Sequence, residues 1–120
     1  MNSSENTFSA HPNTSVDADF VRLEHVALPP ERVIRGEARV GVMELVEHQG
    51  ISIGIWEITP SVSTDVEVDE VFVVLSGAAE VTFDDDTPPL TLRPGSVGRL
   101  AAGSRTTWHV TETLRKIYIA

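Results

Sequence analysis

The chain has 120 residues, 41% of them apolar, which is enough for one domain with its own core. It has no cysteine, which excludes disulfides, thiolate zinc sites and thiol nucleophiles. A formal net charge of −9, with the basic residues scattered, argues against binding to nucleic acids or anionic lipid surfaces. No segment has the roughly 20 apolar residues of a membrane span, and residues 1–19 lack the apolar run of a signal peptide, so we expect a cytoplasmic protein.

Residues 1–19 are predicted to form a flexible N-terminal arm. Ser, Asn, Thr, Asp and Pro dominate this stretch, and its isolated hydrophobic residues cannot bury enough area to offset the entropy of ordering. Residues 20–120 are predicted to form a single domain. At its start Pro29 and Pro30 exclude a helix and Gly36 marks a turn, so we expect short extended segments there.

From residue 39 onward the apolar residues recur with a period close to two, which is typical of β-strands. Turns are expected at residues 48–50, at Ser76-Gly77, over 84–89, at 93–95 and at 102–104. Many short strands separated by glycine and proline indicate an all-β sandwich or barrel. The expected strands are RVGVMELVE (39–47), ISIGIWEI (51–58), EVFVVLS (70–76), AEVTF (79–83), LTL (90–92), SVGRL (96–100) and RTTWHVTETLRKIYIA (105–120), the last as one or two strands.

Several of these stretches resemble motifs of the cupin superfamily, whose fold is a double-stranded β-helix or jelly-roll barrel. Glu70, six residues and Gly77 match the second half of the first cupin motif. RPGSVGRLAAGSRT (93–106) matches the frame of the second motif, with Thr106 at the histidine position. GIWEITP, DEVFVVLSGAAEVTF and TLRKIYIA are similar to small single-domain cupins of the ureidoglycine aminohydrolase and ethanolamine-utilisation type. The resemblance covers roughly residues 28–120 and implies an all-β cupin barrel that pairs as a homodimer.

The histidine ligands of metal-binding cupins are missing from this sequence. Such cupins hold a divalent metal with a His-x-His pair, a glutamate and a later histidine. Counting back from Glu70, the pair falls on residues 64 and 66, or on 63 and 65, and neither choice includes a histidine, while Thr106 takes the last position. We therefore expect no cofactor, because one carboxylate does not replace three imidazoles. The alternative is a divalent ion held loosely by oxygen atoms of Asp65 and Glu70.

Glu70 is the main candidate for a functional residue. By the resemblance it points into the barrel, and strand alternation places Phe72 on the same face. A carboxylate in an apolar barrel must be paired, hydrogen-bonded or protonated, and we expect Arg99 or Arg105 as its partner. Two interpretations stay open: a buried ion pair that only stabilises the fold, or a carboxylate that anchors a ligand or transfers protons.

The other acidic residues and the nearby histidine are expected to face outward. Glu67 and Asp69 alternate with valines on the same stretch, which is typical of a solvated strand face. His109 follows Trp108 directly, so alternation places it on the opposite, outer face.

Aromatic residues either line a pocket or fill the core. Trp56, Trp108 and Tyr118 could stack against a planar ligand, and Thr106 should share a face with Trp108 because the two are two residues apart. Aromatic rings in a small barrel are more often plain core.

The predicted function is metal-independent binding of a small molecule in the barrel. The predicted ligand-binding residues are Glu70, Phe72, Arg99, Thr106, Trp108 and Tyr118, and a carboxylate suits a nitrogen-rich or cationic ligand. The alternative is a hydrolase-like or isomerase-like enzyme that uses Glu70 as acid or base, or an atypical oxygen-ligated metal. A structural or regulatory subunit is the third possibility. The expected partners are a small molecule and a second copy of the chain, with no nucleic acid and no membrane.

Overall fold

The structure is a computed structural model and describes residues 11–120. Its described part is almost entirely β-structure, with one short 3-10 helix and no α-helix. Within these residues no helix has the length and apolar character that a membrane crossing requires. The elements are β1 (Val26–Ala27), η2 (Pro30–Arg32), β2 (Val33–Gly36), β3 (Arg39–His48), β4 (Ile51–Ile58), β5 (Ser61–Val66), β6 (Glu70–Phe83), β7 (Leu90–Leu92), β8 (Val97–Leu100) and β9 (Arg105–Ile119).

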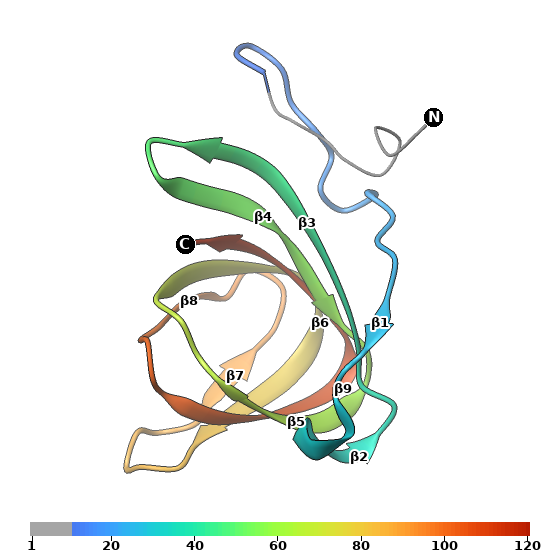
Figure 1. Cartoon of the computed structure of the whole chain (residues 1–120), viewed down its shortest axis with the longest axis vertical. Coiled ribbons are helices and arrows are strands. Elements are labelled where there is room, and N and C mark those ends of the chain that lie inside the picture. The colour runs from blue at the N-terminus through green and yellow to red at the C-terminus, as the bar shows by residue number, and fades with distance from the viewer. Residues whose placement is uncertain (1–10) are drawn as a thin grey trace.

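The strands form one strongly curled antiparallel sheet that closes on itself as a barrel (Figure 1). One path through the sheet runs β1-β3-β4-β9-β5-β2, and β6 pairs with β7, β8 and β9. Strand β9 holds the barrel together, because its first half pairs with β5, its second half with β4, and most of its length with β6. This arrangement confirms the predicted all-β, double-stranded β-helix of the cupin jelly roll.

Strand β6 differs from the prediction, which placed a turn at Ser76-Gly77 between two strands. The structure shows one continuous strand, Glu70–Phe83, with shifts of register against β9 between Val74 and Ala79. Gly77 has a φ of 92°, and a Cβ atom there would lie 2.0 Å from the carbonyl oxygen of Thr113. The glycine therefore makes a bulge that bends the strand around the barrel and does not reverse the chain.

The expected turn at residues 48–50 is confirmed as the tip of the β3–β4 hairpin. Gln49 and Gly50 both have positive φ angles, 53° and 81°, as the tightest hairpin turns require. The pairing of β3 with β4 starts at this turn and shifts by one residue between Glu44 and Val46, after which Val42 pairs with Trp56. The hairpin thus carries Trp56 to the barrel wall.

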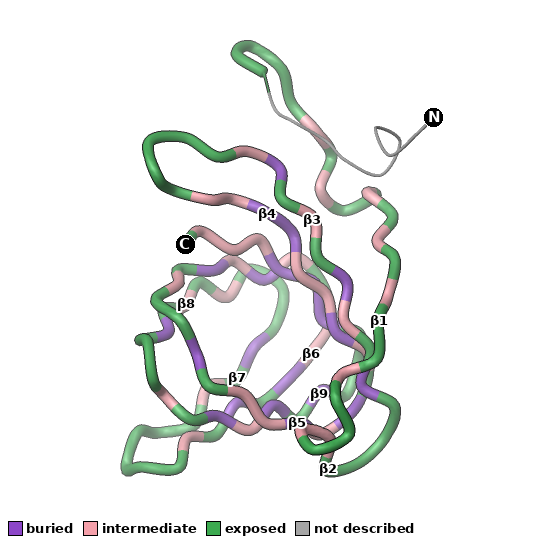
Figure 2. The backbone as a smooth tube through the Cα atoms, viewed as in Figure 1, coloured by how far each residue is buried: buried purple, intermediate pink, exposed green. Residues whose placement is uncertain are grey.

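Buried and exposed residues alternate along much of the strands, and the buried ones form the core (Figure 2). Phe72 and Val74 on β6, and Trp108 and Val110 on β9, point inward and are buried. Ile58, Ala79, Val81, Leu92, Leu100 and Leu114 complete the cluster. Two members of this core, Phe72 and Trp108, also contact the polar residues Lys116 and Glu67.

The predicted N-terminal arm, residues 1–19, lies in part outside the described residues. Residues 11–19 are mostly exposed and contain no strand or helix. The division into an arm and a domain of residues 20–120 stays a prediction. The segment that follows forms β1 on the edge of β3 and β2 on the edge of β5, as short extended structure should.

Candidate functional site

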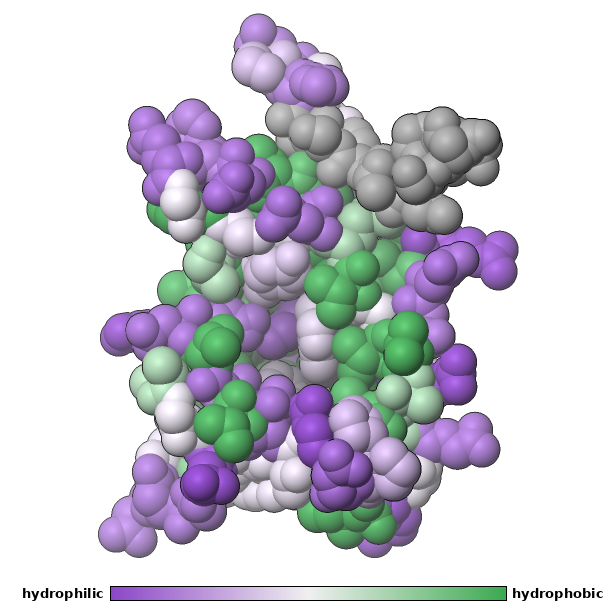
Figure 3. All heavy atoms as spheres, viewed as in Figure 1, coloured by the Kyte–Doolittle hydropathy of each residue, from purple (hydrophilic) through white to green (hydrophobic). Residues whose placement is uncertain are grey.

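A cavity of about 330 Å³ opens at one end of the barrel, between β3, β4, β6, β9 and the β5–β6 connection. Its polar and aromatic wall consists of Trp56, Asp65, Glu67, Glu70, Trp108, Lys116 and Tyr118. Exposed valines, Val42, Val66 and Val68, border it. The molecular surface is hollowed near the middle of the face seen in Figure 3, with polar and apolar side chains mixed around the hollow. Buried charged groups converge here, as in a ligand site.

A larger hollow, of about 560 Å³, lies near η2 at the ends of β5 and β9. Its wall includes Arg32, Asp65, Asp84 and Arg105. Arg32 and Asp65 form an ion pair of 3.2 Å with about a third of each side chain exposed. Since these charges are solvated or already paired, the barrel cavity is the stronger candidate site.

Glu67 lies inside the barrel, so the prediction that it faces solvent is wrong. Only 8% of the residue is exposed. The hydroxyl of Thr106 donates a hydrogen bond of 2.5 Å to its Oε2 atom, and the indole N–H of Trp108 donates one of 3.0 Å to the same oxygen. Alternation failed because β5 ends at Val66 and β6 begins at Glu70, so residue 67 belongs to a connection and not to a strand.

The backbone of the neighbouring turn holds Glu67 in this inward position. Its N–H donates to the carbonyl of Ser104, and its carbonyl accepts from the N–H of Gly103, both at 2.9 Å. The next residue, Val68, points outward instead and is 63% exposed. Asp69 is exposed, as predicted, and accepts a hydrogen bond from the N–H of Ala102. The connection is therefore pinned to the turn predicted at 102–104.

The second oxygen of Glu67, Oε1, receives no hydrogen bond from any residue in the range 11–120. Among these residues no fully buried side-chain oxygen or nitrogen lacks a partner, so this oxygen keeps some accessible surface, and Glu67 is one of the residues that line the cavity. Burial raises the pKa of Glu67 above its ordinary value of 4.5, although the hydrogen bonds from Thr106 and Trp108 oppose the shift. This carboxyl group can accept a proton more readily than an exposed glutamate.

Glu70 points into the barrel, but its partner is not Arg99 or Arg105 as predicted. The Nζ atom of Lys116 lies 3.0 Å from both of its carboxylate oxygens. Arg99 is exposed and pairs across strands with Val71, which shares the outer face, and Arg105 is exposed at the start of β9. Lys116 lies opposite Val74 in the β6–β9 register, so its long side chain extends to Glu70 from four residues further along β6.

Aromatic rings surround the Lys116 ammonium. Its Nζ atom lies 4.6 Å from the ring centre of Trp56, 4.9 Å from that of Phe72 and 5.1 Å from that of Trp108. The two tryptophan rings are 5.5 Å apart and tilted by 53°. Phe72 is fully buried and meets the site only through this lysine, whereas Trp56 and Trp108 also line the cavity. Cation–π attraction of this kind helps a charged lysine to stay buried.

Tyr118 lines the cavity from the end of β9 and is half-buried. It lies across from Phe72 on β6, on the inner face. Burial raises the pKa of its phenol above 10.0, and the charges of Glu44 and Glu70 add to the shift. Tyr118 is therefore a neutral hydrogen-bonding group on the cavity wall at ordinary pH.

The residues at the metal position of the cupin fold do not fit a metal ion. Both oxygens of Glu70 are bonded to the Lys116 ammonium, which cannot be a ligand while it is charged. Asp65 is paired with Arg32, and Thr106 donates its hydroxyl to Glu67. Among residues 11–120 no three His, Cys, Asp or Glu side chains form a group that could hold a metal. No chemical step is therefore assigned to a metal.

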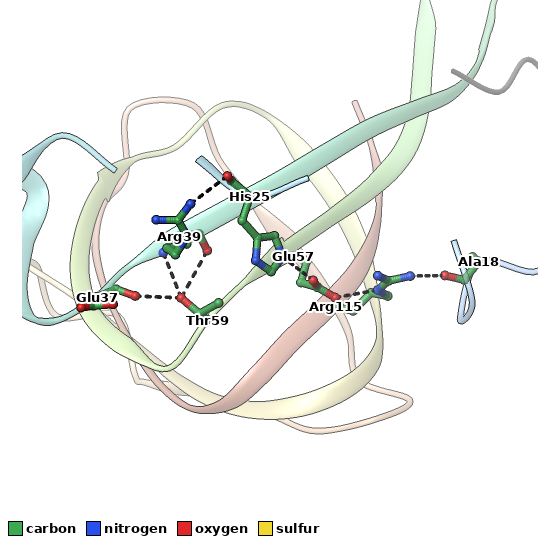
Figure 4. Close-up of polar contacts among 7 residues, drawn as sticks. All are labelled: Ala18, His25, Glu37, Arg39, Glu57, Thr59 and Arg115. Atoms are coloured by element: carbon green, nitrogen blue, oxygen red, sulfur yellow. Dashed lines mark hydrogen bonds and ion pairs between the residues drawn. The ribbon is translucent and has the colours of Figure 1, made fainter. Parts of the chain in front are cut away.

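A second polar cluster lies on the outer face of β4 and β9, and the sequence did not single it out (Figure 4). Glu57 binds His25 Nε2 at 2.6 Å and Arg115 Nε at 2.8 Å, and Arg115 also donates to the carbonyl of Ala18 at 2.8 Å. These contacts fasten residues 18–25 to the barrel. His109, predicted to face outward, is exposed and takes no part in either cluster.

Comparisons with known proteins agree with this fold. Residues 45–118, more than half of the chain, match the family model described as EutQ-like cupin domain. The EutQ protein of Clostridium difficile is 19% identical with a TM-score of 0.58, over 68% of this chain and 67% of that one. A protein of unknown function of the DUF861 family from Pseudomonas syringae pv. tomato DC3000 is 22% identical with a TM-score of 0.71, over 83% of this chain and 44% of that one.

One structural neighbour comes from a study of enzymes. A chain from the DMSP lyases is 19% identical with a TM-score of 0.56, over 67% of this chain and 46% of that one. No functionally curated protein matches the chain significantly. At these identities the structural likeness shows the fold alone, because one fold hosts many functions.

Proposed function

Because the chain belongs to the family of EutQ-like cupin domains, whose barrel encloses a cavity, we propose that it binds a small molecule in that cavity without a metal. The cavity volume, about 330 Å³, suits a compact metabolite. Its wall combines apolar and aromatic surface with a few convergent polar groups, the usual composition of a small-molecule site.

The observation that carries this proposal is the unused oxygen of Glu67. A carboxylate that is more than nine-tenths buried normally has both oxygens satisfied by the protein, yet within residues 11–120 only Oε2 is bonded. Because Glu67 lines the cavity, a ligand N–H or O–H could donate to the other oxygen. The anchoring role that the sequence suggested for Glu70 therefore passes to Glu67, because Lys116 already satisfies Glu70.

A thermal-shift screen of small metabolites, run in the presence of a chelator, tests the proposal. The expected result is a compound that raises the unfolding temperature of the wild type and has a much smaller effect on Glu67→Gln. Glu80→Gln is the matched control, since Glu80 is exposed on the outer face of β6 and its loss changes the net charge equally. If no compound stabilises the wild type, or only metal-loaded protein responds, the proposal fails.

The second candidate function is an enzyme in which Glu67 transfers a proton. The raised pKa of Glu67 favours this reading, because a general acid or base works best when its pKa lies near the working pH. One of the structural neighbours comes from DMSP lyases, which are enzymes. NMR of each stabilising compound after long incubation would reveal turnover, and turnover that persists in Glu67→Gln would exclude this role for Glu67.

The proposal includes the oligomeric state, the cellular location and the classes of partner. A homodimer is expected from the cupin resemblance, and light scattering on the purified protein would measure it. We also propose a cytoplasmic location, from the sequence pattern, and no nucleic-acid or membrane partner, from the net charge of −9.

A further inference from the structure

The charges on the cavity wall do not cancel. Glu67 and Glu70 contribute two carboxylates, and Lys116 contributes the one cationic side chain among the described residues of the wall. Asp65 also reaches the wall, but it is paired with Arg32. One carboxyl group, that of Glu67, is left without a cationic partner.

Lys116 forms its ion pair with Glu70 and not with Glu67, although its charge helps to lower the pKa of Glu67. Its ammonium contacts both oxygens of Glu70 and three aromatic rings, and only 4% of its side chain is exposed. Turning it toward Glu67 would leave the Glu70 carboxylate buried without a cation, which is strongly unfavourable. An anionic ligand would have to compete with Glu70 for the same lysine.

Glu67 is instead bonded only by neutral donors, the hydroxyl of Thr106 and the indole of Trp108. Neutral hydrogen bonds offset only part of the cost of burying an ionised carboxylate. A cation placed at its free oxygen would offset more of that cost and would form a charge-assisted hydrogen bond.

The aromatic wall favours the same kind of ligand. Trp56 and Trp108 already lie within cation–π distance of the Lys116 ammonium, and both also line the cavity together with Tyr118. Aromatic faces attract organic cations more strongly when water is excluded, while an alkyl chain packs well against the same rings. The whole chain, with a net charge of −9, adds a field that attracts cations.

From this charge balance we propose that the cavity binds a small organic cation, an alkylammonium ion that donates an N–H to Glu67 Oε1 and lies against Trp56 and Trp108. This inference rests on the proposed function, because it takes the barrel cavity as the binding site. The ammonium completes a second carboxylate–ammonium pair beside that of Glu70 and Lys116.

Three probes of matched size test the ligand class: n-butylammonium, n-butanol and butyrate. Each is titrated into the full chain while the indole N–H signals of the two tryptophans are followed by NMR, with Trp56→Phe used to assign them. Trp108 reports directly on the site, because its indole N–H is hydrogen-bonded to Glu67. Glu67→Gln and Glu80→Gln are titrated with the same probes.

The expected result is saturable movement of the Trp108 signal with n-butylammonium, at an affinity at least about tenfold above that for butanol and butyrate. Glu67→Gln should weaken this binding by about tenfold or more, and Glu80→Gln should leave it within about twofold. The head-group comparison uses the wild type alone, so it stands even if Glu67→Gln folds poorly.

Tighter binding of butyrate than of butylammonium would overturn the cationic ligand and leave small-molecule binding in the cavity intact. Equal binding of butylammonium by wild type and folded Glu67→Gln would also overturn it. No movement with any probe would reject alkylammonium ions, and the proposed function would then be decided by the metabolite screen.

Discussion

The Nζ atom of Lys116 lies 3.0 Å from both carboxylate oxygens of Glu70, the residue that the cupin resemblance assigns to a metal ligand. The positive charge that neutralises Glu70 is thus a side chain of β9. Because the two groups are nearly buried, the pair is expected to matter for folding.

Lys116→Met should destabilise the protein by about 3–5 kcal/mol, because it leaves the Glu70 carboxylate buried without a cation. Glu70→Met combined with Lys116→Met should recover most of that loss, because no buried charge is left unpaired. Urea unfolding of the two single variants and the double variant measures the coupling. A single variant as stable as the wild type would show that the pair is not formed.

Glu67 should make stability fall as pH rises above 4.5. Its pKa is raised in the folded state, so its contribution is fully present below the unfolded value of 4.5 and is lost as pH increases through the folded pKa. Glu67→Gln keeps an oxygen acceptor for Thr106 and Trp108 but does not titrate. The gap in unfolding free energy between the variant and the wild type should therefore widen in favour of the variant from pH 4.5 toward neutrality. A pH-independent gap would contradict the raised pKa.

Glu57 should have the opposite pH dependence. Burial alone would raise its pKa, but the hydrogen bonds and charges of Arg115 and His25 hold the pKa below 4.5. Its contribution is therefore present above the unfolded value of 4.5 and is lost as pH falls through the folded pKa. Glu57→Gln should cost about 1–3 kcal/mol at neutral pH and less in acid. Denaturant unfolding at several pH values measures the loss of unfolding free energy in Glu57→Gln. A loss that grows as pH falls would contradict the contacts of Glu57 with Arg115 and His25.

Gly77→Ala should destabilise the barrel far more than Gly50→Ala. Both glycines have positive φ angles, which cost an alanine about 1–2 kcal/mol. Nothing lies within 4 Å of a Cβ atom at Gly50, whereas a Cβ atom at Gly77 would collide with the backbone of Thr113. The expected extra loss at Gly77 is about 2 kcal/mol or more, measured by thermal unfolding. Equal losses would mean that the β6 bulge is not as tight as described.

Most strands and the hairpin at Gln49-Gly50 could be predicted because alternation and turn chemistry are local properties. Strand β5, Ser61–Val66, was not among the expected strands, and the inward direction of Glu70 was implied by the cupin resemblance. The continuous strand through Gly77 could not, since a positive φ angle serves a bulge as well as a turn. A glycine that forms a bulge within a strand and a glycine that forms a turn between two strands give the same sequence pattern here.

The site was only partly predictable, for two physical reasons. Glu67 lies in a connection, where side-chain direction depends on the turn at Gly103 and Ser104 and not on alternation. The partner of Glu70 lies 46 residues away on β9, so its identity depends on strand register across the barrel, which no local pattern encodes. Trp108 and Thr106 were placed on one face correctly, but the carboxylate that they bind was not anticipated.

Metal content, measured by mass spectrometry on tag-free protein beside Glu70→Gln, tests the claim of a metal-independent barrel most directly. With Lys116 bonded to both Glu70 oxygens, the expected result is no stoichiometric divalent metal in either protein. Near-stoichiometric metal in the wild type that disappears in Glu70→Gln would contradict the account, because Glu70 would then be holding an ion in place of the lysine.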